Sequence, residues 1–324
     1  MHRFTVAFAE GETSAVRFGP EGPPDLVLLH ATGFNAGTYR PILETLGKQF
    51  RVVAIDQRGH GRCKLAARPE RLRSWTDYVD DFLTLGRHLW GDAPPPVLAG
   101  HSMGGAVALM ATARRPDIAD RLVLLDPVMP SHRLALLALW LLPLRARIAG
   151  IPIAQGAARR RERFATRADA IASYRGRGAF ATWDPAFLDA YAEDGFKDTD
   201  DGEVTLSCAP LWEAATFAGL RVDVASALGR LKRPALILRA GRGSATRASR
   251  QRMLALNPDL RIETVSGTTH FLPMEMPGLV CDRLTRALTE RASSLVSSAA
   301  PEADVPAQAP LMSAGFGRSP TSSP

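Results

Sequence analysis

The fold is decided by the stretch Val97-Leu98-Ala99-Gly100-His101-Ser102-Met103-Gly104-Gly105-Ala106. It begins as a short apolar run, typical of a buried strand, and continues as an alanine-rich helical pattern that Pro116 ends. At the junction, Ser102 has one glycine two residues before it and another two residues after it. A sharp strand-to-helix turn needs glycine at these places, because larger side chains would collide with the neighbouring helix and strand.

Such a turn predicts a reactive serine. The strained backbone holds the hydroxyl of Ser102 clear of the sheet, and the first N–H groups of the following helix favour a developing negative charge beside it. A Gly-x-Ser-x-Gly string alone is a weak signal, and its alternative is a glycine-rich turn without chemistry. The apolar strand before it and the helix after it make the signal specific.

Apolar runs and helical patterns alternate on both sides of this turn. Short strand candidates are found at 26–29, 50–55, 97–99, 122–125, 235–238 and 261–265. Helical patterns between them predict a parallel sheet that is covered on both faces. Residues 127–224 interrupt the alternation with a helix-like segment and no convincing series of strands. We expect this segment to form a helical cap over the carboxyl edge of the sheet, where open parallel sheets place their sites.

Three other turns agree with the serine turn in type and order. They read His30-Ala31-Thr32-Gly33-Phe34, Asp56-Gln57-Arg58-Gly59-His60-Gly61 and Gly267-Thr268-Thr269-His270-Phe271. Together with Gly100 to Gly105 they resemble the oxyanion turn, the D-x-R-G-x-G turn, the histidine turn and the nucleophile elbow of the α/β-hydrolase fold superfamily. Ala31 stands where the family has glycine. The resemblance covers about residues 3 to 292.

The resemblance implies an α/β-hydrolase fold, in which helices flank a mostly parallel central sheet and a helical cap is inserted. We expect residues 1–126 to form the first part of the core, 127–224 the cap and 225–292 the second part of the core. Residues 293–324 are rich in Ser, Ala and Pro. They cannot bury enough apolar area to offset the entropy of ordering, so we expect a disordered tail.

The base of the site is expected to be His270. A serine hydroxyl is a poor nucleophile until a base takes its proton. His270 follows the last strand candidate and comes late in the chain, as the order of serine, acid and histidine in this fold requires. The other histidines in motif turns, His30, His60 and His101, resemble structural positions of the family.

The acid is displaced in this chain. Many family members carry it in a G-x-x-D turn after the strand at 235–238, but that turn reads Gly241-Arg242-Gly243-Ser244, and no Asp or Glu occurs between residues 232 and 258. A neutral serine cannot stabilise an imidazolium as a carboxylate does. Other members place the acid one strand earlier, at the position of Asp126. We therefore expect Asp126 to complete the triad; the alternative is that it caps the first cap helix.

The oxyanion needs two preorganised N–H donors. By resemblance, these are the backbone amides of Thr32 and Met103, and a further contribution from the Thr32 hydroxyl is a hypothesis. Arg58 is expected to be structural, with a carboxylate partner that the sequence does not identify.

The cap is expected to shape the substrate pocket and to exclude water. Its candidate lining residues are apolar or aromatic and favour a neutral, fairly hydrophobic substrate: Leu137, Trp140, Leu141, Phe180, Trp183 and Trp212. Each of them is also compatible with a place in the core of the cap.

The expected function is hydrolysis of a carboxylic ester, lactone or thioester through a Ser-His-Asp triad and an acyl-enzyme, with no cofactor and no metal. A C–C bond hydrolase or a cofactor-free haloperoxidase would use the same triad. A serine at position 102 argues against haloalkane dehalogenase and epoxide hydrolase chemistry. The sequence is also compatible with a ligand-binding or signalling protein on the same scaffold, and with a lipase acting at a membrane surface.

Composition is that of a globular protein, with 46% hydrophobic and 23% charged residues. The net charge of +7 is spread among interleaved acidic residues, and the densest basic run, Arg159 to Arg163, is expected to be a solvated helix face. No recognition element accompanies it, so nucleic acid is not an expected partner.

The cellular setting is expected to be the cytoplasm. Cys63, Cys208 and Cys281 form no pattern typical of disulfides or zinc. The first ten residues lack the apolar region of a signal peptide, and the apolar stretch Leu134 to Leu144 is too short to span a bilayer. The sequence leaves the oligomeric state open.

Overall fold

The computed structural model describes residues 1–72, 74–130, 142–219 and 223–299. Within these residues a central sheet of eight strands has the order β1-β2-β4-β3-β5-β6-β10-β11. The strands are β1 (His2–Phe8), β2 (Gly11–Phe18), β3 (Leu26–Leu29), β4 (Val52–Ile55), β5 (Val97–His101), β6 (Leu122–Leu125), β10 (Ala235–Ala240) and β11 (Arg261–Val265).

The sheet is parallel from β4 to β11. Only the hairpin of β1 and β2 runs antiparallel, at one edge. Strands β3, β4, β5 and β6 are buried along their whole length. Near-continuous apolar runs are what a strand covered on both faces requires. The mostly parallel sheet predicted from the alternation of the sequence is thereby confirmed.

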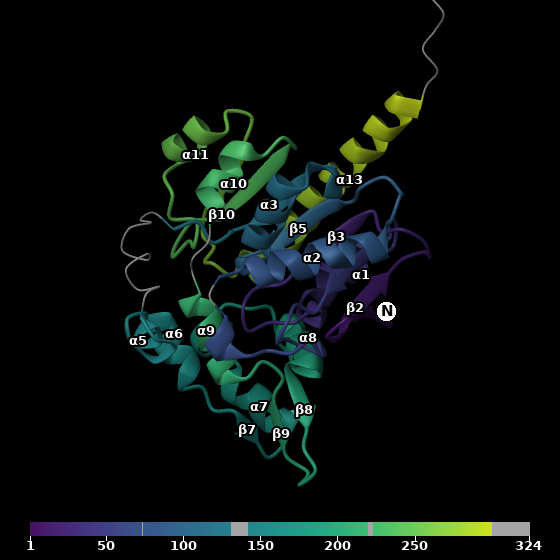
Figure 1. Ribbon diagram of the computed structural model, residues 1–324. Helices are drawn as coiled ribbons and strands as arrows, with labels where there is room; N and C mark the ends of the chain where they lie inside the picture. The colour runs from purple at the N-terminus through teal and green to yellow at the C-terminus, as the bar shows by residue number, and fades with distance from the viewer. Residues whose placement is uncertain (73, 131–141, 220–222, 300–324) are drawn as a thin grey trace, which may run out of the picture.

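Helices cover both faces of the sheet (Figure 1). On one face, α2 (Thr76–Leu89), α3 (Met103–Arg114), α10 (Val224–Arg230) and α11 (Arg250–Leu256) pack on strand residues such as Val27 and Leu29. On the other, α1 (Arg40–Leu46) and α13 (Pro277–Ala299) pack on their alternate neighbours Leu26 and Leu28. Shorter elements are α12 (Leu272–Glu275) and the 3₁₀ turns η1 (Ala36–Tyr39), η2 (Pro69–Arg71), η3 (Pro116–Ile118) and η4 (Gly178–Phe180).

An insert lies between β6 and β10 and forms a layer below the sheet in the view of Figure 1. Its described helices are α5 (Leu144–Ala149), α6 (Pro152–Ala158), α7 (Arg167–Tyr174), α8 (Pro185–Gly195) and α9 (Pro210–Ala218). It also contains a three-stranded antiparallel sheet of β7 (Arg163–Phe164), β9 (Val204–Leu206) and β8 (Phe196–Asp198). The cap is thus mainly helical, as expected, but its small sheet was not predicted, because strands of two or three residues are too short to show an alternating pattern.

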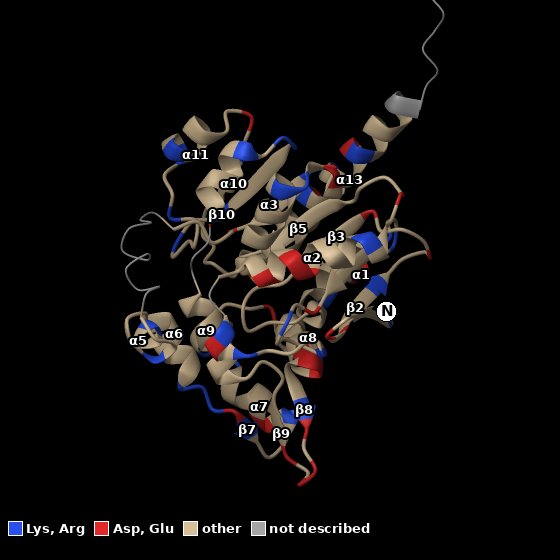
Figure 2. Cartoon of the chain, viewed as in Figure 1, with Lys and Arg blue, Asp and Glu red and all other residues tan. Residues whose placement is uncertain are grey.

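The basic run from Arg159 to Arg163 is exposed except at Arg160, as expected, but it does not lie on a helix. Arg159 ends helix α6 and Arg163 begins strand β7. Between them, the side chain of Arg160 is only 21% exposed and pairs with Glu213, which follows 53 residues later. A charge pattern read along the chain cannot show such a distant partner. Elsewhere, basic and acidic residues are interspersed along most elements (Figure 2).

The end of the fold also differs from the expectation. Helix α13 continues to Ala299, so the expected start of the tail at residue 293 falls inside it. The hydroxyls of Ser293 and Ser294 donate to the carbonyl oxygens of Thr289 and Glu290, 3.1 and 2.9 Å away, which lets serine remain in a helix. Residues 300–324 lie outside the described part of the chain.

Candidate active site

Ser102 lies in the predicted turn between β5 and α3. Its backbone has φ 56° and ψ −114°, a conformation that residues other than glycine rarely adopt. A Cβ on Gly100 would lie 2.4 Å from the carbonyl oxygen of Gly104, and one on Gly104 would lie 2.2 Å from that of Leu29. Both glycines are therefore required by the close approach of the backbone, for the reason that the sequence indicated.

The structure brings together the three residues expected to form the triad. His270 Nε2 lies 2.9 Å from Ser102 Oγ, and His270 Nδ1 lies 2.7 Å from Asp126 Oδ2. Asp126 is fully buried, whereas the side chain of His270 is 23% exposed. These contacts allow the imidazole to take the proton of the hydroxyl while the carboxylate holds the ring in the required tautomer.

Asp126 is bound by the turn after β10, which carries the acid in many members of the superfamily that the sequence resembles. Its Oδ1 accepts hydrogen bonds from the Ser244 hydroxyl at 2.5 Å and the Ala240 amide at 3.0 Å. Its Oδ2 accepts the amide of Ala245 at 2.8 Å. Ser244, which replaces the usual carboxylate, thus donates to the carboxylate that comes from the neighbouring strand. The sequence showed that the acid was missing from this turn, but not that the turn would bind the displaced one.

These contacts keep Asp126 ionised. Burial opposes the charge of the carboxylate, but hydrogen bonds from His270, Ser244 and the Ala240 amide, together with the nearby imidazole, outweigh it and lower the pKa of Asp126. Asp126 also has a positive φ of 43°, a rare conformation for aspartate. The contact between Asp126 Oδ2 and His270 Nδ1 is the geometry that the expected role of triad acid requires.

His101 links the serine turn to the histidine turn and to the expected oxyanion turn. The Ala31 amide donates to the Tyr39 hydroxyl, which lies 2.7 Å from His101 Nδ1. The other nitrogen of His101 lies 2.8 Å from the carbonyl oxygen of His270. Burial and the neighbouring His270 lower the pKa of His101 to about 3, so the ring stays neutral. Tyr39 belongs to none of the sequence motifs, so its contacts with Ala31 and His101 could not be predicted from the sequence.

The two residues expected to supply the oxyanion donors are adjacent in space. The hydroxyl of Thr32 lies 3.4 Å from the sulfur of Met103, and both residues are buried beside Ser102. In this structure the Thr32 hydroxyl donates to the sulfur, and its contribution to the oxyanion hole stays a hypothesis. The backbone amides remain the expected donors.

The remaining motif residues stabilise the turns around the site. The amide of Gln57 donates to His30 Nε2 at 2.9 Å, and the Gln57 side chain donates to the His30 carbonyl oxygen at 2.7 Å. Arg58 makes two hydrogen bonds, of 2.8 and 2.7 Å, to Asp81 of helix α2. Asp81 is therefore the carboxylate partner that the sequence could not identify.

A profile of the alpha/beta hydrolase family matches residues 26–283, which is most of the chain. The chain belongs to the alpha/beta hydrolase family. It is 28% identical, over 267 residues, to a 2-(acetamidomethylene)succinate hydrolase of Mesorhizobium japonicum; the match covers 81% of this chain and 87% of that protein. It is also 34% identical over 110 residues to a monoacylglycerol lipase of Mycolicibacterium smegmatis, which covers 33% of this chain and 39% of the lipase.

Solved structures agree with this assignment. A crystal structure of E-2-(acetamidomethylene)succinate hydrolase superposes with a TM-score of 0.71 at 25% identity, covering 88% of this chain and 98% of that one. A thioesterase domain from the curacin biosynthetic pathway has a TM-score of 0.72 at 17% identity over 88% of this chain and 99% of that one, and supports the fold alone. By family and relatives, the protein is a hydrolase.

Two expected lining residues of this hydrolase, Phe180 and Trp183, belong to an aromatic cluster beside the triad. The Trp183 ring centroid lies 5.0 Å from that of Phe34, the last residue of the expected oxyanion turn, and 5.9 Å from that of Phe271, which follows His270. Phe180 lies 4.7 Å from Trp183. The cap thereby contacts both turns through aromatic rings.

The cap segment that carries Trp183 is fastened to the histidine turn. The hydroxyl of Thr182 donates to Glu275, and the amide of Asp184 donates to the carbonyl oxygen of Met274 at 3.1 Å. The same Glu275 carboxylate accepts a hydrogen bond from the amide of Thr269, next to His270, at 2.7 Å. No sequence pattern singles out Glu275, because its role depends on these contacts.

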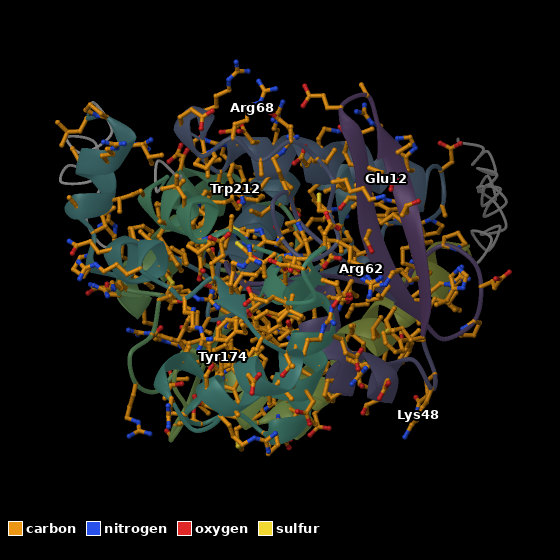
Figure 3. The ribbon with its side chains drawn as sticks, turned by 90° about the horizontal axis from the view of Figure 1, so that it is seen from below. Glu12, Lys48, Arg62, Arg68, Tyr174 and Trp212 are labelled. Atoms are coloured by element: carbon orange, nitrogen blue, oxygen red, sulfur yellow. The ribbon has the colours of Figure 1, made fainter. Side chains whose placement is uncertain are left out.

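Trp212, another expected lining residue, lies outside the aromatic cluster. Its indole N–H donates to the carbonyl oxygen of Arg58 at 3.1 Å, and its ring packs where a Cβ of Gly59 would be. It therefore joins helix α9 to the turn after β4 and does not belong to the aromatic cluster. Trp212 and Tyr174, which contacts that cluster, lie apart in the view of the cap in Figure 3. The expected lining residues Leu137, Trp140 and Leu141 lie outside the described residues.

A charged pair next to the expected oxyanion turn was missed. Arg160 donates to Glu213 and to the hydroxyls of Tyr174 and Tyr191, at 3.1 and 3.2 Å for the two tyrosines. Glu213 packs directly on Gly33, where an added Cβ would lie 2.4 Å from Oε1. Burial disfavours the guanidinium charge, but Tyr191 and Glu213 outweigh it and raise the pKa of Arg160. The described cap thus has a polar, charged part as well as an aromatic one.

Among the described residues, no helix is both long and apolar enough to cross a membrane. That part of the chain also contains no group of three or more His, Cys, Asp or Glu side chains arranged to hold a metal ion.

Proposed function

We propose that this hydrolase cleaves a carboxylic ester, lactone or thioester of a neutral, fairly hydrophobic acid through a covalent acyl-enzyme. The observation that carries the proposal is the continuous hydrogen-bonded path from Ser102 Oγ through His270 to Asp126. In an aromatic, largely buried setting, such a path needs no cofactor to activate a hydroxyl.

In the acylation step, Ser102 Oγ attacks the carbonyl carbon of the substrate while its proton passes to His270 Nε2. The Asp126 carboxylate stabilises the imidazolium that forms. The negative charge on the carbonyl oxygen is stabilised by the backbone amides of Thr32 and Met103, each worth about 3 kcal/mol. The C–O or C–S bond then breaks, and the leaving alkoxide or thiolate takes the proton from His270.

In the deacylation step, His270 Nε2 takes a proton from a water molecule, whose oxygen attacks the acyl carbon. The bond to Ser102 Oγ breaks, the serine regains the proton, and the free acid leaves. The 2.9 Å distance between Nε2 and Oγ is within the reach that both proton transfers need.

The aromatic cluster of Phe34, Trp183 and Phe271 supports the choice of a hydrophobic acyl group. Its apolar rings contact one another between the turn at Phe34 and the turn at Phe271. Aromatic side chains of this kind are typical of the lining of a pocket that binds an apolar acyl group.

A second candidate is hydrolysis of an amide-bearing dicarboxylic acid. One relative that matches most of this chain is named for 2-(acetamidomethylene)succinate. Another relative, of Acinetobacter baylyi, is named for (E)-2-((N-methylformamido)methylene)succinate; that match is 33% identical and covers 33% of this chain and 39% of the relative. The partly exposed guanidinium of Arg160 is a cationic group near the site. C–C bond hydrolysis would use the same triad, and product analysis separates these reactions.

The first experiment is labelling with a fluorophosphonate probe, read by intact mass on the wild type and on Ser102→Ala. One adduct that is lost in the variant supports an activated serine. Absence of an adduct on folded wild type would contradict the proposal and favour a binding protein on this scaffold. Turnover of p-nitrophenyl butyrate and of 2-(acetamidomethylene)succinate, with the products identified, then decides between the two candidates.

A further inference from the structure

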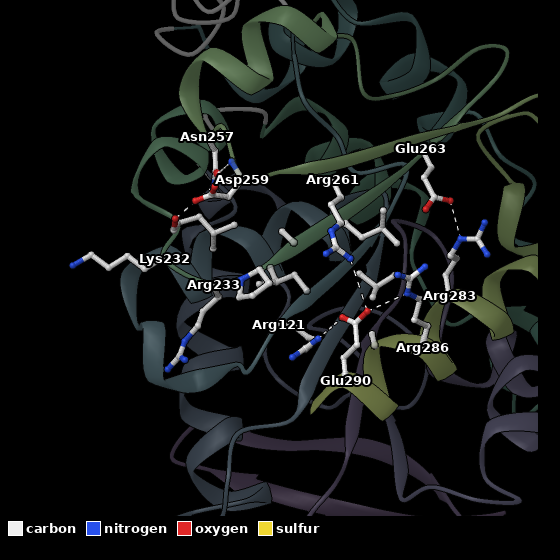
Figure 4. Close-up of a pocket in the computed structure, with 17 residues that line it drawn as sticks. Arg121, Lys232, Arg233, Asn257, Asp259, Arg261, Glu263, Arg283, Arg286 and Glu290 are labelled. Atoms are coloured by element: carbon white, nitrogen blue, oxygen red, sulfur yellow. Dashed lines mark hydrogen bonds and ion pairs between the residues drawn. The ribbon is translucent and has the colours of Figure 1, made fainter. Parts of the chain in front are cut away.

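A pocket of about 440 Å³ lies at the edge of the sheet opposite the triad. It is lined by the first residues of β6, β10 and β11 and by one side of helix α13 (Figure 4). The triad lies at the carboxyl ends of the strands and the pocket at their amino ends, so the length of the strands separates the two sites. A volume of this size is in the range of small-molecule sites, about 300–1,000 Å³.

Basic side chains predominate in this pocket. Six line it, namely Arg121, Lys232, Arg233, Arg261, Arg283 and Arg286, against Asp259, Glu263 and Glu290, which leaves an excess of three positive charges (six minus three). Asp120, which pairs with Arg121 from outside the lining, reduces the excess to two. The pocket therefore has a local charge that its own carboxylates do not balance.

The excess is concentrated around one carboxylate. Glu290 pairs with Arg121, with Arg286 at 3.0 Å and with Arg261 at 3.8 Å, as Figure 4 shows. With Asp120, which also pairs with Arg121, two carboxylates face three guanidinium groups and leave one positive charge unbalanced. Arg261 and Arg286 are each 69% exposed in their side chains, so they are accessible to a ligand.

Two further cations are available at the other side of the pocket. Arg233 donates to the carbonyl oxygen of Pro116 at 2.7 Å, a neutral acceptor, and Lys232 is exposed. Figure 4 shows both side chains extending away from the strands. The inner wall is apolar and comes from strand and helix residues, including Leu122, Ala235 and Ala287.

We propose that this pocket binds an organic dianion, of the class of a phosphate monoester with a small apolar group. A guanidinium presents parallel N–H donors that match the oxygens of a phosphate, and the charge excess of two to three matches a dianion. The apolar wall provides contact for the organic part. Binding in this pocket does not depend on which bond the active site cleaves.

The test is isothermal titration with phenyl phosphate at constant ionic strength, on the full chain. We expect binding to the wild type, and at least about tenfold weaker binding to Arg261→Gln/Arg286→Gln, because two charge-assisted hydrogen bonds are lost. The matched control is Arg87→Gln/Arg177→Gln, which removes the same charge from two exposed arginines outside the pocket. This control should bind as the wild type does.

A second variant tests whether Glu290 competes with the ligand for the arginines that it contacts. Glu290→Gln removes the competing carboxylate and should tighten the binding of phenyl phosphate several-fold, the opposite direction to the arginine variant. Thermal melting of each variant shows that it is folded, and Arg261→Gln alone replaces the double variant if that unfolds.

Three results would overturn the proposal: no binding to the wild type, an equal loss in the Arg87/Arg177 control, or weaker binding in Glu290→Gln. If inorganic phosphate binds as tightly as phenyl phosphate, the apolar group contributes nothing, and the proposal of an organic ligand is wrong. Ester turnover should stay within twofold in all pocket variants, since the substituted residues lie at the opposite edge from Ser102.

Discussion

The turns that carry the triad and the cap beside them are held in place by different kinds of contact. The triad turns are joined by backbone hydrogen bonds: the amide of Ser102 donates to the carbonyl oxygen of Leu125, and that of Asp126 to Leu238, at 3.0 and 2.7 Å. The cap is fastened to the core largely by side chains, such as Asn35, which donates to the Tyr191 carbonyl oxygen at 3.0 Å.

Charged side chains strengthen this contrast. Asp194 of the cap helix α8 pairs with Arg62 at 2.7 Å and with Arg3, both from the core. Backbone hydrogen bonds within a buried sheet persist through most side-chain substitutions, whereas each side-chain contact of the cap depends on a single residue. We therefore expect substitutions in the core turns to act on the chemical step, and substitutions in the cap to act on substrate binding.

The largest effect is expected from Asp126→Asn. The amide would leave the imidazolium of His270 without its anionic partner, and kcat for p-nitrophenyl butyrate should fall by about 10⁴. Steady-state kinetics at pH 7.5 measures this change. A loss of less than tenfold would mean that Asp126 is not the triad acid, and that the core turn does not act on the chemical step as the comparison requires.

The next effect concerns the pH dependence of stability. Burial lowers the pKa of His60 to about 4, and burial together with His270 lowers that of His101 to about 3. An unfolded chain takes up these protons below pH 6.5, where the folded protein does not, so stability is lost as pH falls from 6.5 toward 4. Each pKa difference of one unit corresponds to about 1.4 kcal/mol, which gives several kcal/mol for the two rings.

Asp56 acts in the opposite direction, since burial raises its pKa to about 6 and the folded state binds that proton first. One carboxyl does not offset both rings. Urea unfolding between pH 7.5 and 4.5 should show a falling free energy, and His60→Gln should flatten its slope. An unchanged slope in that variant would argue against a neutral buried ring in the core.

The cap is tested by Glu213→Gln. Removing the carboxylate leaves the guanidinium of Arg160 half-buried beside the expected oxyanion turn, which should cost about 2 kcal/mol of stability. We expect KM to rise about tenfold, with the rate of fluorophosphonate labelling within twofold of the wild type. Glu203→Gln is the control, because its pair with Arg163 is exposed. A fall in the labelling rate equal to the change in kcat/KM would show that the cap acts on the chemical step.

The smallest effect is expected from Ser244→Ala. The variant removes one of the hydrogen bonds to Asp126, while the Ala240 and Ala245 amides remain. A single hydrogen bond to a charged group is worth about 1.5–3 kcal/mol, so kcat should fall roughly tenfold, far less than in Asp126→Asn. The pH profile of kcat is the second measurement, and an unchanged profile and rate would mean that the turn after β10 supports the acid through its backbone alone.

The sequence predicted the core well because its signals are local. The turn around Ser102 needs glycine at fixed places, and the approach of 2.4 Å at Gly100 is the reason. Asp126 was expected because no carboxylate follows β10, and its contact with His270 agrees with that expectation. Boundaries were less well predicted, as the continuation of α13 to Ala299 shows.

The amino-acid sequence by itself determined the order of strands and helices, the strained serine turn and the residues offered as base and acid. Only the tertiary structure decided the rest: that Ser244 binds Asp126, 118 residues away, that Arg160 pairs with Glu213, and that Trp212 packs on Gly59. The physical reason is the range of the interactions. Backbone strain and apolar periodicity act over a few residues and leave a pattern in the chain, whereas a contact between distant side chains depends on how the whole sheet and its insert are packed.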